Sequence, residues 1–491
     1  MRAKIFAQEN RKWWTLGALS FALFMIMLDN TVVNVALPSI KKDLGISQSE
    51  LEWTVAAYAL TFASLLLSGG KLGDLLGRRL IFVIGLAVFT VSSLLCGLSG
   101  SAAELIAARG VQGVGAALMM PATLSIITAT FAAKERGTAI GVWAGVSAMA
   151  LAIGPLLGGV ITEHISWNWI FYVNVPIGVG GVIAAFLVVP ESKDTSKEQR
   201  LDLPGLLTSG IGLFALVYAL IEANQYGWSS ARIVGLFVIS AVSLGAFVLL
   251  ELHQRLPMLD LSLFRNGTFA GANLVAILVT MAMFGIFVFF PLYMQTLLGW
   301  SPIQAGAALV PWTMMVVIFA PVAGKLSDRV GSRWLMAGGM TVVAICCVLL
   351  STISLHSSFW QLLPSFVLGG LGMAFVMTPM SAAAMGAAPV DKAGVASGVL
   401  NTFRQVGVAL GIGIMGAIVA DRAAAAVRGG AAPPQAFVDG LTFGMRVSAA
   451  ICLGGALAAA VLVRKYRHAE PVRQEAPEAA ALQAARQEAA Q

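Results

Sequence analysis

The sequence predicts an all-α polytopic membrane protein, and two observations lead to this fold class. Of the 491 residues, 58% are hydrophobic and only 11% are charged, whereas soluble domains carry roughly 25% charged residues. Apolar runs long enough to cross a bilayer, which takes about 20 residues per helix, recur from Trp13 almost to Arg464. The formal charge of +7 does not indicate a nucleic-acid partner, because the basic residues lie in short connections between apolar runs, where they orient a membrane protein.

Polar residues divide the apolar sequence into fourteen predicted membrane helices. Lysine and arginine gather in alternate connections and near both ends of the chain, which by the positive-inside rule places both termini in the cytoplasm. An even number of helices agrees with this orientation. The predicted spans are 13–38, 51–70, 79–99, 102–127, 138–162, 168–189, 203–223, 231–252, 268–297, 303–323, 334–354, 358–380, 394–420 and 441–463.

Two segments of the first half return in the second half. GKLGDLLGRR at Gly70–Arg79 returns as GKLSDRVGSR at Gly324–Arg333, and a shorter G-x-A-x-G pattern recurs at nearly the same spacing. Two six-helix bundles in tandem explain these repeats, and parallel repeats of this kind are typical of alternating-access transporters, whose site lies between the halves. We therefore predict an N-terminal bundle (1–190), a linker with two inserted helices (191–256), a C-terminal bundle (257–465) and a cytoplasmic tail (466–491), to which we assign no function.

Asp29 is the only charged side chain in the first predicted helix. A carboxylate inside the membrane is costly unless the protein uses it, so Asp29 is predicted to carry a proton, to contact the substrate, or to do both. Its depth is about 13 Å from the outer end of that helix, given a rise of about 1.5 Å per residue.

Arg109 is the only charged residue in the membrane part of the fourth predicted helix. It lies about 12 Å from the outer end of its helix, the same depth as Asp29. A positive partner that approaches and leaves would control whether Asp29 binds a proton, and a permanent structural ion pair is the alternative.

Several motifs taken together resemble the major facilitator superfamily, specifically its fourteen-helix drug/proton antiporter branch (EmrB/QacA-like). The resemblance covers nearly the whole chain, and one departure is Asn168, where relatives usually carry arginine. The motifs are LDNTVVNVALP at 28–38, GKLGDLLGRR at 70–79, RGVQGVGAA at 109–117, GPLLGG at 154–159, WNWIFYVNVPIG at 167–178 and LGWSPIQAGAALVP at 298–311.

The resemblance implies a major facilitator fold (6 + 2 + 6 helices) and assigns Asp29 and Arg109 to proton coupling. It also implies that Asp74 engages the start of a helix in the other bundle, where a carboxylate suits the positive end of the helix dipole. We predict that opening the cytoplasmic side breaks this contact, although a basic loop that only sets topology is the alternative. The predicted gating residues are Gly70, Asp74, Gly77, Arg78, Arg79, Gly324, Asp328, Gly331 and Arg333.

The GPLLGG segment supplies Gly154, Pro155, Gly158 and Gly159 to the fifth predicted helix. Small residues allow close approach of helices and proline can kink them. By resemblance this is the antiporter motif, whereas tight packing accounts for the same residues equally well.

Two more charged residues are candidates for coupling or for the cavity. Arg404 is the only charge between Lys392 and Asp421, and a structural anchor and a cavity-lining role are equally good interpretations. Glu222 ends the seventh predicted helix beside polar residues, so an exposed carboxylate is favoured over a coupling site.

The substrate cavity is predicted to be largely apolar. Methionine and aromatic side chains can repack around varied ligands, although contact with lipid is the commoner role of such residues. The candidates are Phe21, Met25, Met281, Phe284 and Phe287, together with Asn34, Gln112, Asn273 and Gln295 as hydrogen-bonding residues.

The sequence therefore predicts proton-coupled efflux (antiport) of hydrophobic small molecules or drugs across the cytoplasmic (inner) membrane. Export of an endogenous lipid or metabolite is the alternative, and a membrane-embedded enzyme is disfavoured because the four histidines are scattered. Neither Gly-Lys pair completes an ATP-binding motif. We expect no metal and no cofactor, and we expect the proton gradient to be the energy source. The expected partners are the lipid bilayer, protons and the substrate. We expect the protein to function as a monomer.

Overall fold

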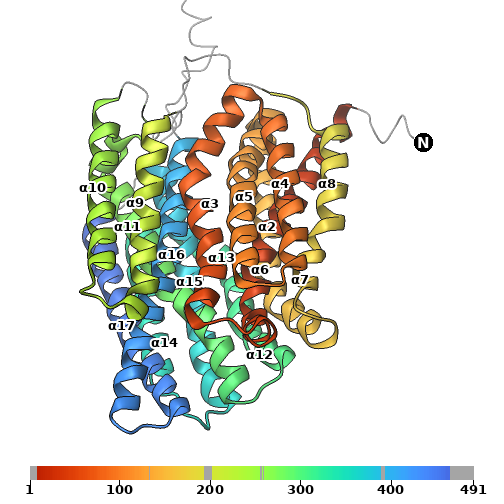
Figure 1. Cartoon of the computed structure of the whole chain (residues 1–491). Helices are drawn as coiled ribbons and strands as arrows, with labels where there is room; N and C mark the ends of the chain where they lie inside the picture. Colours follow the sequence, from red (N-terminus) through yellow and green to blue (C-terminus); the bar gives the residue numbers. More distant parts are fainter. Residues whose placement is uncertain are drawn as a thin grey trace, which may run out of the picture.

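The computed structural model describes residues 8–131, 133–192, 202–254, 257, 259–388 and 393–464, and every regular element in these ranges is a helix. The predicted tail at 466–491 and most of the polar linker after residue 192 lie outside the described residues. The helices of the first half are α2 (Gln8–Leu44), α3 (Gln48–Leu76), α4 (Arg78–Leu98), α5 (Ala102–Thr130), α6 (Ala133–His164), α7 (Trp169–Tyr172) and α8 (Asn174–Val188) (Figure 1).

Two further helices and a second set complete the described chain. The inserted pair is α9 (Leu203–Tyr226) and α10 (Ala231–His253). The second set is η1 (Leu261–Arg265), α11 (Gly267–Leu292), η2 (Tyr293–Leu297), α12 (Pro302–Ala308), α13 (Val310–Val330), α14 (Ser332–Leu350), α15 (Phe359–Ala387), α16 (Ala393–Arg428) and α17 (Pro433–Leu462).

Thirteen helices within the described residues are long and apolar enough to cross a membrane. The chain is therefore an all-helical, multi-pass membrane protein, as its composition predicts. The helix α6, which has 32 residues, is not among the thirteen. The count of fourteen and the cytoplasmic location of the termini stay predictions.

Helices extend beyond the apolar spans because polar residues can continue or cap a helix. The first span is predicted to end at Pro38, yet α2 continues to Leu44, since the residues around this proline, such as Leu37 and Ile40, are fully buried and hold the helix in place. Ser47 begins α3 with a capping box to Glu50, which satisfies backbone groups at the helix start.

The predicted single span at 303–323 is divided in the structure. Ser301 caps the short helix α12 and Leu309 separates it from α13. Pro311 in the first turn of α13 cannot donate a backbone hydrogen bond, which is consistent with a new helix starting there.

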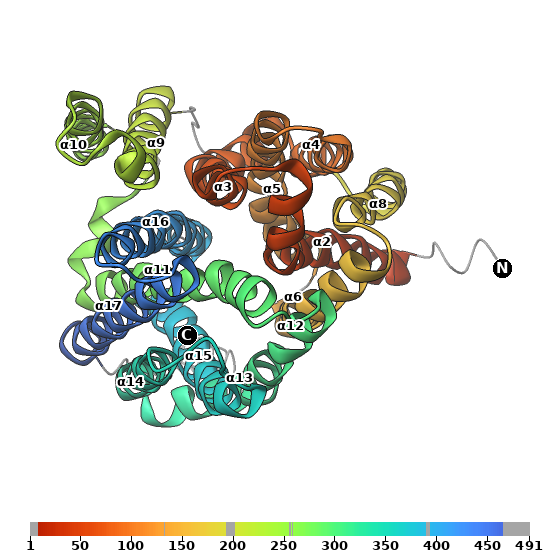
Figure 2. The same ribbon diagram turned by 60° about the horizontal axis from the view of Figure 1, so that its bottom comes forward.

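The helices pack as two groups. In the first group α3 and α4 pack on α5, and α2 packs on α6; in the second, α14 packs on α15 and α17, and α11 packs on α16 (Figure 2). The groups meet where α16 lies on α3, α11 on α2, and α12 and α13 on α6, while α9 contacts both α3 and α16.

The molecule has two ends along the helix axes. We call the end where α2 begins and α17 ends the proximal end, and the end where α2 is followed by α3 the distal end. Figure 1 shows the distal end at the bottom, with α12 and the turns of α14 and α17.

Candidate functional site

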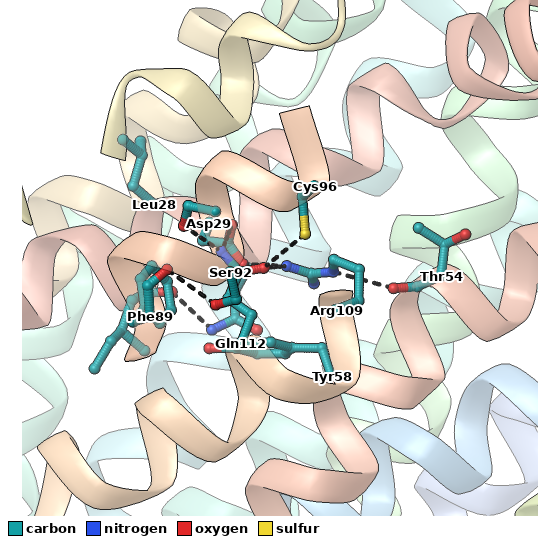
Figure 3. A network of polar contacts seen from close by, with 12 residues as sticks. Leu28, Asp29, Thr54, Tyr58, Phe89, Ser92, Cys96, Arg109 and Gln112 are labelled. Atoms are coloured by element: carbon teal, nitrogen blue, oxygen red, sulfur yellow. Dashed lines mark hydrogen bonds and ion pairs between the residues drawn. The ribbon is translucent and has the colours of Figure 1, made fainter. Parts of the chain in front are cut away.

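Asp29 and Arg109 form an ion pair in the interior of the first helix group. Arg109 Nη1 donates to Asp29 Oδ2 at 2.5 Å, and their side chains are 1% and 0% exposed, respectively, for Arg109 and Asp29. Figure 3 shows the two side chains pointing toward one another from α5 and α2. The structure thus brings together the two residues predicted to couple.

The guanidinium group of Arg109 has further partners on α3. Its Nε donates to the backbone oxygen of Thr54 at 3.1 Å, and its central carbon lies 4.4 Å from the centre of the Tyr58 ring. Phe171 of α7 lies on another side at 5.8 Å. Such aromatic contacts stabilise a cation that water does not reach.

Gln112 links both charged residues to α4. Its Oε1 accepts from Arg109 Nη1 at 2.6 Å, and its Nε2 donates to Asp29 Oδ1 at 3.0 Å and to Ser93 Oγ at 2.8 Å. Cys96 Sγ also approaches Gln112 Oε1, at 3.7 Å. Both carboxylate oxygens of Asp29 are therefore paired, which is what a buried ion pair needs to offset its desolvation.

This placement corrects the prediction that Gln112 lines an apolar cavity. Gln112 is fully buried and its amide is used within the network. The spacing places Gln112 on the same face of α5 as Arg109, since residues three apart on a helix share a face. The sequence does not show whether that face meets a cavity or other helices, because this depends on packing.

The GPLLGG segment packs α6 against α2 directly beside Asp29. A β-carbon added at Gly154 would lie 1.9 Å from Thr31 Oγ1, and one added at Gly158 would lie 2.7 Å from the backbone oxygen of Val32. Only glycine fits at such distances, so these residues set the position of the α2 segment that carries Asp29.

The same segment also contacts the second helix group at the distal end. A β-carbon at Gly159 would lie 2.6 Å from the Pro302 oxygen, and one at Gly306 would lie 2.2 Å from the Pro155 oxygen. The interpretation as close packing is confirmed by these distances, and the antiporter role stays a prediction.

Two polar contacts join the helix groups in the same distal region. Gln295 Nε2 donates to the Val35 oxygen at 2.8 Å, and the backbone N–H of Ile303 donates to Glu163 Oε2 at 2.8 Å. Gln295, predicted as a cavity residue, thus bridges α2 and η2. Together with the glycine contacts, these bonds hold the distal end closed.

The repeated loops have matching backbone geometry. Gly77 and Gly331 have φ values of 124° and 91°, a region that favours glycine, and each joins two helices at the proximal end. Gly77 and Gly331 thus make the turn between the two helices in each copy of the repeat, whereas Gly70 lies inside α3.

The charged residues of the first repeated loop pair locally. Asp74 Oδ1 accepts from Arg78 Nε at 2.9 Å, and Arg79 Nε lies 3.6 Å from Glu191 Oε2. The contact of Asp74 with the other bundle, which the resemblance implies, is therefore a prediction for another conformation. In the second loop Arg333 lies over the Trp334 ring at 4.9 Å, and the side chain of Asp328 is outside what the structure describes.

The other cavity candidates fall into three sets, which are exposed, buried and half-buried. Phe21 is 63% exposed, whereas Met25 is fully buried in the core of the first helix group, so its assignment to a cavity surface is wrong in this conformation. Asn34 and Asn273 are also buried. Met281, Phe284 and Phe287 of α11 are half-buried, and Phe287 contacts the Trp312 ring.

The two remaining charged candidates lie in different surroundings. Arg404 of α16 is half-buried, with Nη1 donating to Asn401 Oδ1 at 3.4 Å, which leaves both interpretations open. Glu222 is only 8% exposed and accepts from Trp53 Nε1 at 3.0 Å. The expectation of an exposed carboxylate is wrong, because α9 packs on α3 and α16 and covers the side chain.

Glu52 is a buried acid that the sequence did not single out. Glu52 of α3 is 3% exposed and lies near Glu222. Glu52 falls in the first turn of the predicted span 51–70, and the apolar run that follows it is the one signal of burial in the sequence.

The comparison with known families decides the identity of this architecture. The Major Facilitator Superfamily profile matches residues 19–412 and 272–488. The chain belongs to this superfamily.

Curated relatives of this superfamily member are drug-resistance transporters. It is 36% identical over 459 residues to the puromycin resistance protein of Streptomyces alboniger, covering 92% of this chain and 91% of the relative. It is 33% identical to the tetracenomycin C resistance and export protein of Streptomyces glaucescens, over 84% of this chain and 77% of the relative. It is also 33% identical to the multidrug transporter protein MdtP of Bacillus subtilis, over 84% and 76%.

Solved structures show the same fold. A bacterial homologue of the human lysosomal transporter Spinster, in an inward-facing and unoccupied conformation, superposes with a TM-score of 0.66 at 17% identity, covering 94% of this chain and 99% of that one. An auto-inhibited peptide transporter of the POT family gives a TM-score of 0.67 at 16% identity, with coverage of 94% and 98%.

Proposed function

We propose that this protein exports hydrophobic small molecules or drugs in exchange for protons, by alternating access across the cytoplasmic membrane. The observation that carries the proposal is the buried network of Asp29, Arg109 and Gln112. In this network a titratable carboxylate, Asp29, is paired with Arg109 inside the membrane part of the protein. The relatives named for antibiotic resistance support the choice of drugs as the substrate class.

In the proposed cycle, the proton and Arg109 compete for Asp29. When a proton binds the carboxylate, the ion pair loses its electrostatic attraction, and Arg109 keeps its bonds to Thr54 and Gln112. The helix α6 packs on α2 through Gly154 and Gly158. A shift of α2 would therefore move α6 and change the contacts between α6 and α12 at the distal end.

The proposed orientation places the proximal end in the cytoplasm. The loops at that end carry the basic residues of both repeats, among them Arg78, Arg79, Lys325 and Arg329, as expected from the positive-inside rule. With α6 added to the thirteen candidate spans, the proposed topology has fourteen membrane helices. The distal contacts then close the outer side.

The decisive experiment is substrate counterflow in proteoliposomes, with a panel of dyes, antibiotics and lipids, measured with and without a pH gradient. We expect a gradient that is acidic on the distal side to drive uptake of at least one hydrophobic drug in inside-out vesicles. An equal transport rate with and without the pH gradient would rule out proton coupling.

A deletion strain separates drug export from export of an endogenous compound. Increased susceptibility to drugs with an unchanged lipid and metabolite profile supports the proposal. Normal susceptibility with an accumulated lipid or metabolite would favour the endogenous substrate instead.

A further inference from the structure

A second group of titratable side chains lies near the distal end, where α3, α9 and α16 meet. Glu52 of α3 and Glu222 of α9 are 3% and 8% exposed, and the Asp29 network uses neither of them. Gln48 Nε2 donates to Glu52 Oε1 at 3.2 Å, and Trp53 Nε1 donates to Glu222 Oε1 at 3.0 Å. We call Gln48, Glu52, Trp53 and Glu222 the distal junction.

The charges at the distal junction do not balance. Within the part of the chain that the structure describes, the charged groups that act on the Glu52 carboxylate are Glu222 and Lys41. Lys41 Nζ donates to Gln48 Oε1 at 3.0 Å, so the amide of Gln48 stands between the ammonium group and Glu52. Two carboxylates and one ammonium leave one negative charge without compensation.

An uncompensated buried carboxylate is costly. Two carboxylates that occupy one buried site relieve this cost when they hold a proton between them. The amide of Gln48 and the indole of Trp53 satisfy one oxygen of each carboxylate without supplying a positive charge. The junction therefore requires about one proton to be neutral.

The helix α16 seals the junction from the second helix group. A β-carbon at Gly416 would lie 2.1 Å from Glu52 Oε2, and one at Gly413 would lie 3.0 Å from Leu220 Cβ of α9. Glu52 thus fits into a space that only glycine leaves open. Because α3 and α16 belong to different helix groups, this contact must separate when the distal end opens.

We propose that Glu52 and Glu222 form a second proton-binding site, in which one proton shared by the two carboxylates holds the distal end closed. The proton forms an O–H bond with a carboxylate oxygen and comes from the solution on the distal side. When α16 moves away from α3, water solvates the carboxylates and the proton returns to the same solution.

This site changes the balance between closed and open conformations without adding to the number of protons carried across the membrane. It gives the inserted helix α9 a role, because α9 supplies the second carboxylate. The inference rests on the proposed function only in assuming that the distal end opens.

Distance measurement by electron spin resonance in lipid nanodiscs tests the inference on the full-length chain. Nitroxide labels are attached at Lys42→Cys and Val427→Cys, which are exposed positions at the distal ends of α2 and α16; the four native cysteines are buried. Without substrate, we expect the label distance to lengthen as the pH is raised, since the junction loses its proton.

The variants Glu52→Gln and Glu222→Gln each replace one carboxylate by a neutral amide of the same shape. We expect both to keep the short distance at every pH, because only one carboxylate then remains at the junction and no proton has to be shared. Glu50→Gln is the matched control: Glu50 lies on the same turn and caps Ser47, a role that glutamine also fills, so the wild-type response should persist.

A wild-type pH response in both Glu52→Gln and Glu222→Gln overturns the inference, as does its loss in Glu50→Gln. No substrate is needed, so the result is independent of antiport. If the wild-type protein fails to exchange drug for protons but shows a distance change that Glu52→Gln removes, the proposed function fails and the second site stands.

Discussion

The two buried acid sites of this molecule satisfy their charges in opposite ways. At Asp29 a guanidinium group lies 2.5 Å from the carboxylate and Gln112 pairs the other oxygen. At the distal junction the buried Glu222 carboxylate acts on the buried Glu52 carboxylate, and the amide of Gln48 lies between Glu52 and the ammonium group of Lys41. A mobile partner can displace a proton at the first site, whereas the second site needs a proton to stay buried.

The two acid sites also differ in where they lie relative to the two helix groups. Asp29 and Arg109 both lie in the first helix group, so their pairing can survive relative motion of the two groups. Glu52 is covered by Gly416 of the second group. Its surroundings change as soon as the groups move apart at the distal end.

Replacing the paired acid should give the largest effect. We expect Asp29→Asn to abolish gradient-driven export while the protein still inserts in the membrane, because the amide oxygen can accept from Arg109 but the side chain cannot release a proton. Transport in proteoliposomes measures this. Asp439→Asn, at an exposed carboxylate, is the control, and gradient-driven export by Asp29→Asn would refute proton coupling at this residue.

Adding one carbon beside Asp29 should have the next largest effect. Gly154→Ala would place a β-carbon 1.9 Å from Thr31 Oγ1, whereas Gly145→Ala on the same helix meets nothing within 4 Å. For Gly154→Ala we expect a loss of about 1–3 kcal/mol in stability, because α2 and α6 must move apart, together with a large loss of transport. For Gly145→Ala we expect neither loss. Thermal unfolding and transport assays on both variants test this, and equal behaviour would contradict the packing role.

Removing the shared amide should weaken the Asp29 site without abolishing it. Gln112→Leu leaves one buried carboxylate oxygen of Asp29 without its donor, at a cost of about 1–3 kcal/mol. We expect export to slow by about tenfold, since about 1.4 kcal/mol corresponds to a factor of ten. Gln435→Leu, at an exposed position, should export at the wild-type rate; a wild-type rate in Gln112→Leu would show that the bond to Asp29 is dispensable.

The smallest effect is expected at Lys41, whose ammonium group donates to Gln48 of the distal junction. Among the described residues Lys41 is the positive charge that acts on Glu52, so Lys41→Gln should let the closed junction retain its proton to higher pH. The pH midpoint of distal opening should rise by a fraction of a unit, because Gln48 already separates the two groups. The label distance described above measures this midpoint, and a shift to lower pH would contradict the charge balance.

The sequence by itself determined the membrane class, the tandem repeat and the pairing of Asp29 with Arg109. A charge isolated in an apolar run is visible without coordinates, and helical rise converts residue spacing to depth. The glycine turns at Gly77 and Gly331 follow from the repeat in the same way, since each copy joins two helices at a similar place.

Only the tertiary structure decided which face of each helix is covered. Gln112 was assigned to a cavity and lies in the ion-pair network; Glu222 was expected to be exposed and is buried by α9, α3 and α16. The physical reason is that nearly every face of a membrane helix is apolar, so hydrophobic periodicity does not distinguish lipid from protein. Contacts between distant helices, such as Glu52 against Gly416, have no signal along the chain.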